Sequence, residues 1–201
     1  MTDSTVFLVD DDASVRDSLA LLLSLNGFRT QVFADASGFL DTYQPEWRGC
    51  LLTDLRMPGI GGIELQQSIQ SRQWRIPVVV LTAHGDVQTT RLAMKHGAFD
   101  FLEKPVDDRV LVDVLGNAIQ EDARRHVGMV VERQAKHLME RLTPRERDVM
   151  NLLVEGLSQR EIAVQLGISP RTVEVYKSRM MEKLQCRNLA EALRLAMAAG
   201  S

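Results

Sequence analysis

Four groups of polar side chains each follow a short apolar run, and together their types could perform phosphoryl chemistry. They are Asp10-Asp11-Asp12 after residues 6–9, Asp54 after 51–53, Thr82 after 78–81 and Lys104 after 99–102. Carboxylates that lie together repel one another, so a cation is needed to keep them ionised. Oxygen ligands of this kind suit Mg²⁺, which also bridges to phosphate. A carboxylate can attack phosphorus to give an acyl phosphate, while a metal ion, a hydroxyl and a lysine offset the charge of the transferred group.

The elements that must position these side chains can be predicted from the apolar pattern. Continuous apolar runs are typical of strands buried on both faces of a parallel sheet, and a weaker run lies at 30–33. Amphipathic stretches separate the runs, at about 13–26, 35–43, 62–72 and 86–96. Five strand–helix pairs in order predict a doubly wound, flavodoxin-like α/β fold with five parallel strands. Ligands of such sheets bind beyond the carboxyl ends of the strands, where all four polar groups would meet.

A simpler explanation exists for the acidic triplet. Acids that follow a strand are often solvated turn residues or helix caps, and Asp12 is predicted to cap the helix at 13–26. The joint placement of Asp54, Thr82 and Lys104 at successive strand ends favours a metal and phosphoryl site instead.

Residues 1–120 resemble the receiver domain of two-component response regulators. The matching motifs are Leu8-Val9-Asp10-Asp11, Thr53-Asp54-Leu55-Arg56-Met57-Pro58-Gly59, Leu81-Thr82-Ala83 and Phe101-Leu102-Glu103-Lys104-Pro105. One departure is Gly61-Gly62, which replaces the polar residue and glycine common in that loop and is expected to affect only local loop stiffness.

The resemblance implies a role for each matching residue. Asp54 would be the phosphoacceptor, and the ligands of a Mg²⁺ ion would be Asp10, Asp11, Asp54 and the main-chain carbonyl of Arg56. Thr82 would bind a phosphoryl oxygen, Lys104 would pair with the phosphate, and Phe101 would be the switch aromatic. The peptide bond between Lys104 and Pro105 is expected to be cis, as in relatives.

The chain from residue 107 onward, nearly half of its length, is predicted to be helical. Residues 107–137 have helical spacing and could form one long helix, although Gly116 or Gly128 could interrupt it. Beyond Thr143, four short helices are predicted at about 144–155, 159–166, 170–184 and 189–198. Each follows a capping residue, and these caps are Thr143, Ser158, Ser169 and Asn188.

Residues 159–178 fit a helix-turn-helix with its turn at Gly167. The second helix and the residues after it, 169–187, carry a net of three positive charges, which suits contact with phosphates. A charged surface on a module that binds protein or RNA is the alternative. Residues 138–201 resemble LuxR-type DNA-binding domains through Leu142-Thr143-Pro144-Arg145-Glu146, through the stretch from Gly167 to Tyr176, and through Met181-Glu182-Lys183-Leu184.

By that resemblance, the second helix of the motif reads DNA. Glu174, Val175 and Ser178 would face base edges, where glutamate can accept from cytosine and valine can contact a thymine methyl. The residues expected to contact phosphates are Arg171, Thr172, Lys177 and Arg179.

The whole chain resembles the FixJ/NarL family of response regulators, including StyR-like regulators of aromatic-compound catabolism. The implied division is a receiver at 1–120, a helical linker at 121–137 and a DNA-binding domain at 138–201. The implied partners are a sensor histidine kinase, double-stranded promoter DNA and RNA polymerase, with a homodimer forming on phosphorylation through the surface around 86–103. The family is not enzymatic beyond assisting its own phosphorylation and dephosphorylation.

Composition and charge agree with two different tasks in one cytoplasmic protein. The chain has 201 residues and a net charge of −3, with ten basic and sixteen acidic residues in 1–120 but ten and eight in 138–201. Two distant cysteines suit neither a disulfide framework nor a zinc cluster, and no apolar run is long enough to span a membrane. A Mg²⁺-dependent phosphohydrolase is the enzymatic alternative, but no second acid lies two residues after Asp54. The absence of a P-loop motif excludes a P-loop NTPase.

Overall fold

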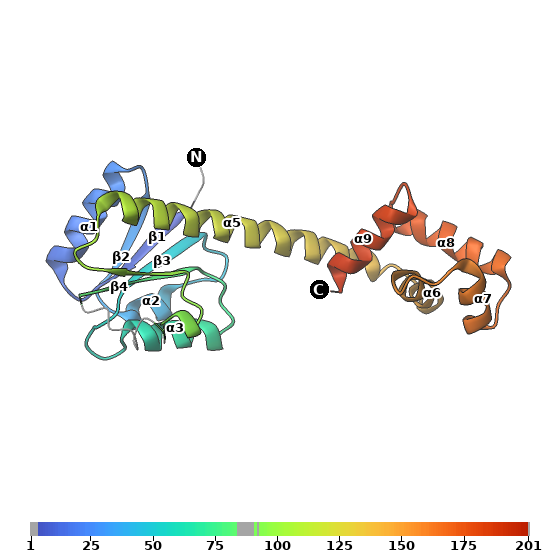
Figure 1. Cartoon of the computed structure of the whole chain (residues 1–201), viewed down its shortest axis with the longest axis horizontal. Coiled ribbons are helices and arrows are strands. Elements are labelled where there is room, and N and C mark those ends of the chain that lie inside the picture. Colours follow the sequence, from blue (N-terminus) through green and yellow to red (C-terminus); the bar gives the residue numbers. More distant parts are fainter. Residues whose placement is uncertain (1–3, 84–90, 92, 201) are drawn as a thin grey trace. The chain divides into compact units, whose positions relative to one another are not determined.

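The computed structural model describes residues 4–83, 91 and 93–200, and the chain divides into two compact units, Met1–Arg125 and His126–Ser201 (Figure 1). The first contains a sheet with helices on both faces, and the second is helical in its described residues. Separate hydrophobic clusters form their cores.

The sheet of the first unit confirms the predicted fold class. Its strands are β1 (Thr5–Val9), β2 (Arg29–Phe33), β3 (Gly49–Asp54), β4 (Val78–Thr82) and β5 (Asp100–Glu103). They pair in parallel in the order β2-β1-β3-β4-β5. Every residue of β3 and β4 is buried, because a parallel sheet is covered on both faces.

Successive strand residues point to opposite faces, and each face has its own core. Phe7 and Val9 pack with residues of α2 (Ala36–Thr42) and α3 (Gly62–Ser71). Val6 and Leu8 pack with residues of α1 (Ala13–Leu25) and of α5 (Asp108–Met139). In Figure 1, α1 and α5 accordingly lie on one side of the strands and α2 and α3 on the other. The helix predicted at 86–96 falls largely on 84–90 and 92, which lie outside the described residues, and residues 91 and 93–95 are helical.

Helix α5 is continuous over 32 residues and passes through both glycines that could have interrupted it. A glycine inside a helix costs about 1 kcal/mol relative to alanine but does not remove a main-chain hydrogen bond. In the first half of the helix, burial of Leu111 and Leu115 offsets that cost. In the second half, ion pairs one turn apart support the exposed helix, among them Glu132 with Lys136 at 2.5 Å.

The second unit contains the four predicted helices. They are α6 (Pro144–Val154), α7 (Gln159–Leu166), α8 (Pro170–Leu184) and α9 (Leu189–Ala199). Each predicted cap accepts the amide hydrogen three residues on, and Thr143 and Ser158 form complete capping boxes. Gly167 ends α7 with φ of 65°, a left-handed conformation that lets the chain turn into α8.

Candidate functional site

Four of the predicted site residues meet at the carboxyl edge of the sheet. Asp54 is the last residue of β3, Thr82 is the last residue of β4, and Asp10 and Lys104 directly follow β1 and β5. Strands β1, β3, β4 and β5 are neighbours in this order, so their carboxyl ends lie side by side. The topology thus brings together side chains that are up to 94 residues apart in sequence.

The Lys104 ammonium joins the two buried carboxylates of this edge. Its Nζ lies 2.5 Å from Asp54 Oδ1 and 3.1 Å from Asp10 Oδ2. Asp10 and Asp54 are only 2% and 9% exposed, and buried carboxylates require such pairing. Burial acts to lower the pKa of Lys104, but its bonds to the two carboxylates outweigh that effect, and the pKa is raised. The lysine therefore stays charged at neutral pH.

Main-chain groups orient the same carboxylates. The Arg56 amide donates to Asp54 Oδ2 at 2.7 Å, and the Asp12 amide donates to Asp10 Oδ1 at 2.9 Å. The Lys104 amide donates to the Thr82 carbonyl at 2.7 Å, which ties the ends of β4 and β5 together. Thr82 itself is buried. Asp12 caps α1, as predicted, by accepting the amide hydrogens of Ser14 and Val15.

Asp11 is not brought into this cluster. Its side chain is exposed, and within residues 4–83, 91 and 93–200 no three His, Cys, Asp or Glu side chains form a group that could hold a metal ion. The chemistry of the donors nevertheless fits Mg²⁺. Asp10 and Asp54 supply buried oxygen ligands whose charge exceeds that of the single ammonium, and an additional acid follows Asp10 in sequence.

The loop after Asp54 depends on Gly62 more than the sequence indicated. A Cβ atom at Gly62 would lie 2.5 Å from the Asp54 carbonyl oxygen and 3.1 Å from Leu55 Cα. The Gly62 amide also donates to the Leu55 carbonyl at 2.9 Å. Gly62 is the glycine that this loop shares with its relatives, and it is needed because α3 begins in direct contact with the end of β3. The expectation that the departure at Gly61 affects only loop stiffness stays a prediction.

We expect Gly62→Ala to destabilise the first unit by about 1–3 kcal/mol, because the added methyl group has only backbone to displace. Gly61→Ala is the matched control. Its Cβ would meet the flexible Glu64 side chain at 2.8 Å and the Leu55 carbonyl at 3.1 Å, so its effect should be clearly smaller. Urea unfolding followed by tryptophan fluorescence measures this unit alone, since both tryptophans, Trp47 and Trp74, lie in it. Equal midpoints for the two variants would contradict the prediction.

The helix-turn-helix of the second unit presents most of the predicted DNA-contacting side chains to solvent. Buried Val173 holds α8 against α7 and α6. The exposed members of the predicted set are Arg171, Glu174, Val175, Ser178 and Arg179. The others are partly buried. The Lys177 ammonium lies 3.2 Å from Glu174 Oε2, and the Thr172 hydroxyl lies 2.8 Å from that of Ser169.

Two ion pairs, each with a buried acid and a partly exposed basic residue, were missed by the sequence interpretation. Lys183 Nζ lies 2.6 Å from Glu146 Oε2, which joins α8 to α6. Asp122 of α5 accepts from the Gly49 amide at 3.0 Å and from Arg48 at 2.9 Å, which joins α5 to the start of β3. The spacing of these residues in sequence carries no signal that would have revealed either pair.

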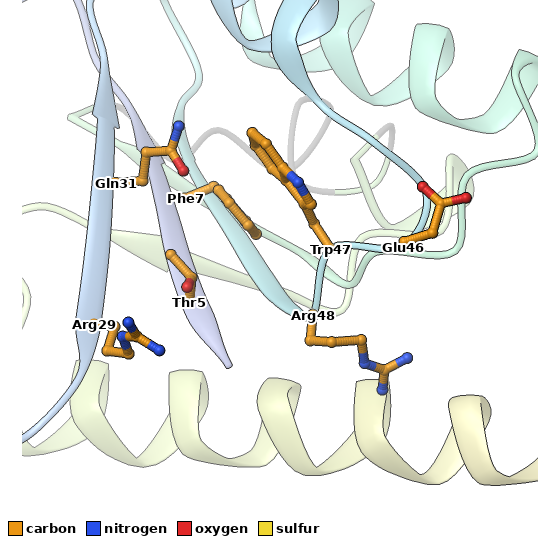
Figure 2. Close-up of a pocket in the computed structure, with 7 residues that line it drawn as sticks. All are labelled: Thr5, Phe7, Arg29, Gln31, Glu46, Trp47 and Arg48. Carbon is orange, nitrogen blue, oxygen red and sulfur yellow. The ribbon is translucent and has the colours of Figure 1, made fainter. Parts of the chain in front are cut away.

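A hollow of about 390 Å³ lies at the amino edge of the sheet, opposite the carboxylates (Figure 2). Two of the side chains that line the hollow make contacts that stabilise the fold. The Trp47 ring stacks on Phe7 with centroids 5.2 Å apart, and Arg48 extends from the hollow towards α5, where it pairs with Asp122. The carboxyl edge therefore remains the candidate site of the first unit. None of the helices in the described part of the chain combines the length and apolar character needed to cross a membrane.

Comparison with known proteins finds a matching family for each of the two units. The family model described as the response regulator receiver domain matches residues 6–116, and that of bacterial regulatory proteins of the luxR family matches residues 140–196. The transcriptional regulatory protein FixJ of Bradyrhizobium diazoefficiens is 43% identical over 99% of this chain and 97% of its own length. The chain belongs to the FixJ/NarL family of two-component response regulators. It controls transcription and is not an enzyme in the usual sense. This finding argues against the alternative that the chain is a Mg²⁺-dependent phosphohydrolase.

Solved structures of relatives extend the similarity of this response regulator over its length. The response regulator StyR is 42% identical, with a TM-score of 0.82 over 98% of this chain and 99% of the other. Full-length FixJ from B. japonicum is also 42% identical, with a TM-score of 0.61 over 100% of this chain and 98% of the other. The predicted link to aromatic-compound catabolism stays a prediction.

Proposed function

We propose that Asp54 accepts a phosphoryl group from a sensor histidine kinase. The observation that carries this proposal is the Lys104 ammonium, held 2.5 Å from Asp54 and 3.1 Å from Asp10 at the ends of neighbouring strands. A carboxylate oxygen of Asp54 attacks phosphorus, the bond from phosphorus to the kinase histidine breaks, and the imidazole leaves with the electron pair. The product is an acyl phosphate on Asp54.

Asp10, Asp11, Asp54 and the main-chain carbonyl of Arg56 would hold a Mg²⁺ ion in this scheme. A bound Mg²⁺ ion would offset negative charge on the transferred group. Binding requires the Asp11 side chain to turn towards Asp10 and Asp54. Lys104 exchanges its contact with Asp54 Oδ1 for a phosphoryl oxygen, and the Thr82 hydroxyl donates to another. Phe101 then shifts with Thr82; the two residues lie on the paired strands β5 and β4, where Phe101 is opposite Val80 and Thr82 is opposite Glu103.

The direct test is mass spectrometry of the protein after incubation with acetyl phosphate and Mg²⁺. An acid-labile adduct with the mass of one phosphoryl group, located on Asp54, is expected. An unmodified protein, or an adduct that remains when Asp54 is replaced, would overturn the assignment.

The phosphorylated receiver is proposed to form a homodimer that binds promoter DNA and acts on RNA polymerase in the cytoplasm. The proposed pairing surface around 86–103 falls partly outside the described residues. The proposed division is a receiver at 1–120, a linker at 121–137 and a DNA-binding domain at 138–201. The family matches at 6–116 and 140–196 support it. A dimer presents two recognition helices to two half-sites of one operator.

Helix α8 is the proposed recognition helix. Glu174, Val175 and Ser178 are assigned to base edges, which their exposure supports. Val175 is 43% exposed although it is apolar, as a side chain that contacts a thymine methyl would be before binding. The residues assigned to phosphates are Arg171, Thr172, Lys177 and Arg179.

We expect Lys177→Ala to weaken binding to all duplexes similarly and to lower the slope of log K against log salt by about one unit, because one phosphate contact is lost. Arg171→Ala removes an exposed charge from the first turn of α8 and should weaken binding and lower the salt slope in the same way. Titrations of operator and unrelated duplex at several salt concentrations measure both effects. An unchanged slope for Lys177→Ala alone would show that Lys177 serves only its ion pair with Glu174.

A further inference from the structure

Lys183 stands apart from the other basic residues of the recognition helix. It lies in the last turn of α8, and its ammonium bonds to Glu146 Oε2 at 2.6 Å. The Glu146 side chain is 3% exposed and that of Lys183 is 36% exposed, whereas Arg171 and Arg179 are exposed residues. The Lys183 ammonium is therefore bound to a buried acid of α6, whereas Lys177 pairs with Glu174 of its own helix.

Glu146 is held from two directions. Its Oε2 also accepts the Thr143 amide at 2.8 Å, which completes the capping box at the start of α6. Burial acts to raise the pKa of Glu146, but the bonds from Lys183 and Thr143 outweigh it and lower the pKa, so the carboxylate is ionised at neutral pH. The acid lies at the amino end of α6 and the lysine at the carboxyl end of α8, and each position is favourable for its charge.

The ion pair lies beside the core that α6 and α8 share. Met180 and Leu184 flank Lys183 on α8 and pack with Met150 of α6 and with Leu142. At the other end of α8, Gln159 of α7 donates to the Pro170 carbonyl at 2.7 Å, and Val173 is buried. The recognition helix is thus anchored near both ends, and Lys183 provides the charged anchor at its carboxyl end.

We propose that the Glu146–Lys183 ion pair is a positioning device that sets the rotation and tilt of α8, so that its exposed face meets base edges in register. This inference rests on the proposed role of α8 as recognition helix. Base contacts require correct placement of donors and acceptors, whereas phosphate attraction tolerates small displacements. Loss of the pair should therefore reduce operator affinity much more than affinity for unrelated DNA.

The test uses the full-length protein phosphorylated with acetyl phosphate, titrated with operator and unrelated duplexes at several salt concentrations. Lys183→Met is expected to lower operator affinity about tenfold, to change non-specific affinity by less than about twofold, and to leave the salt slope unchanged. Lys183→Arg should restore most of the loss because it can pair with Glu146. Arg141→Met, which removes a charge from an exposed residue before α6, is the control and should leave the ratio of the two affinities unchanged.

A second variant keeps the test sharp if Lys183→Met folds poorly. Glu146→Gln retains an oxygen that can accept the Thr143 amide but removes the charge, so it should produce the same loss. The double variant should lose no more than either single one, because both changes break one interaction. Binding is measured at temperatures where circular dichroism shows each variant to be folded.

Three results would overturn the proposal. The first is an equal loss of affinity for both duplexes with a salt slope lowered by about one unit, which would identify Lys183 as a phosphate contact. The second is an unchanged operator affinity of a folded Lys183→Met variant. The third is a loss of affinity in the double variant that equals the sum of the losses in the single variants. Failure of the proposed function is distinguishable from all three, since the wild type itself would then show no preference for operator DNA.

Discussion

Asp54→Asn is expected to abolish acid-labile phosphorylation and, with it, phosphorylation-dependent protection of promoter DNA. The amide is nearly isosteric with the carboxylate but is uncharged and cannot form the acyl phosphate. The fold should persist, because the Arg56 amide can still donate to the side-chain oxygen of the introduced amide and Lys104 keeps its contact with Asp10. The measurement is footprinting of wild type and variant, each with and without acetyl phosphate, alongside mass spectrometry.

Asp41→Asn is the matched control. Asp41 lies on α2 and is exposed, so its replacement removes the same charge without touching the carboxyl edge of the sheet. It should be phosphorylated and should protect DNA like the wild type. A phosphodonor-dependent footprint in Asp54→Asn that equals the wild type would refute the role of Asp54.

Lys104→Met is expected to produce the second large effect, a loss of stability that Mg²⁺ reverses. Without the ammonium, the buried carboxylates of Asp10 and Asp54 repel one another and lack a counter-charge. Breaking a fully buried pair costs about 3–5 kcal/mol, and since the Lys104 side chain is 25% exposed we expect a smaller loss of about 2 kcal/mol. A divalent cation relieves the same repulsion, so the increase in stability with Mg²⁺ should be larger in the variant.

Urea unfolding followed by tryptophan fluorescence, with and without saturating MgCl₂, measures this effect. Lys95→Met, at an exposed helical position, is the control and should leave the Mg²⁺ response unchanged. The pKa of Lys104 is raised above its ordinary value of 10.5, so its stabilising charge is fully present below that pH and is lost only as pH rises through the raised pKa. A Mg²⁺ response equal in wild type and Lys104→Met would contradict the proposal that Mg²⁺ and the Lys104 ammonium relieve the same repulsion between Asp10 and Asp54.

Local pattern in the sequence was sufficient to predict most of the fold. Apolar runs marked the strands because a parallel sheet buries both of its faces, and the caps at Thr143 and Ser158 marked helix starts because their hydroxyls satisfy the first free amides. Four site residues could be predicted to meet because each follows a run and parallel strands end at the same edge. Each of these signals spans only a few consecutive residues, so the local conformation depends on neighbours in the sequence and can be predicted from them.

Pairings across the chain were decided only by the tertiary structure. Lys104 selects Asp54 and Asp10, at separations of 50 and 94 residues, and leaves Asp11 exposed. Lys183 pairs with Glu146, 37 residues away, although it was counted with the positive charges of residues 169–187 that suit contact with phosphates. Gly62 is required because two backbones approach closely there. Each outcome depends on which surfaces pack together and on the free-energy cost of burying an unpaired charge. Both are determined only when the helices and the sheet are assembled.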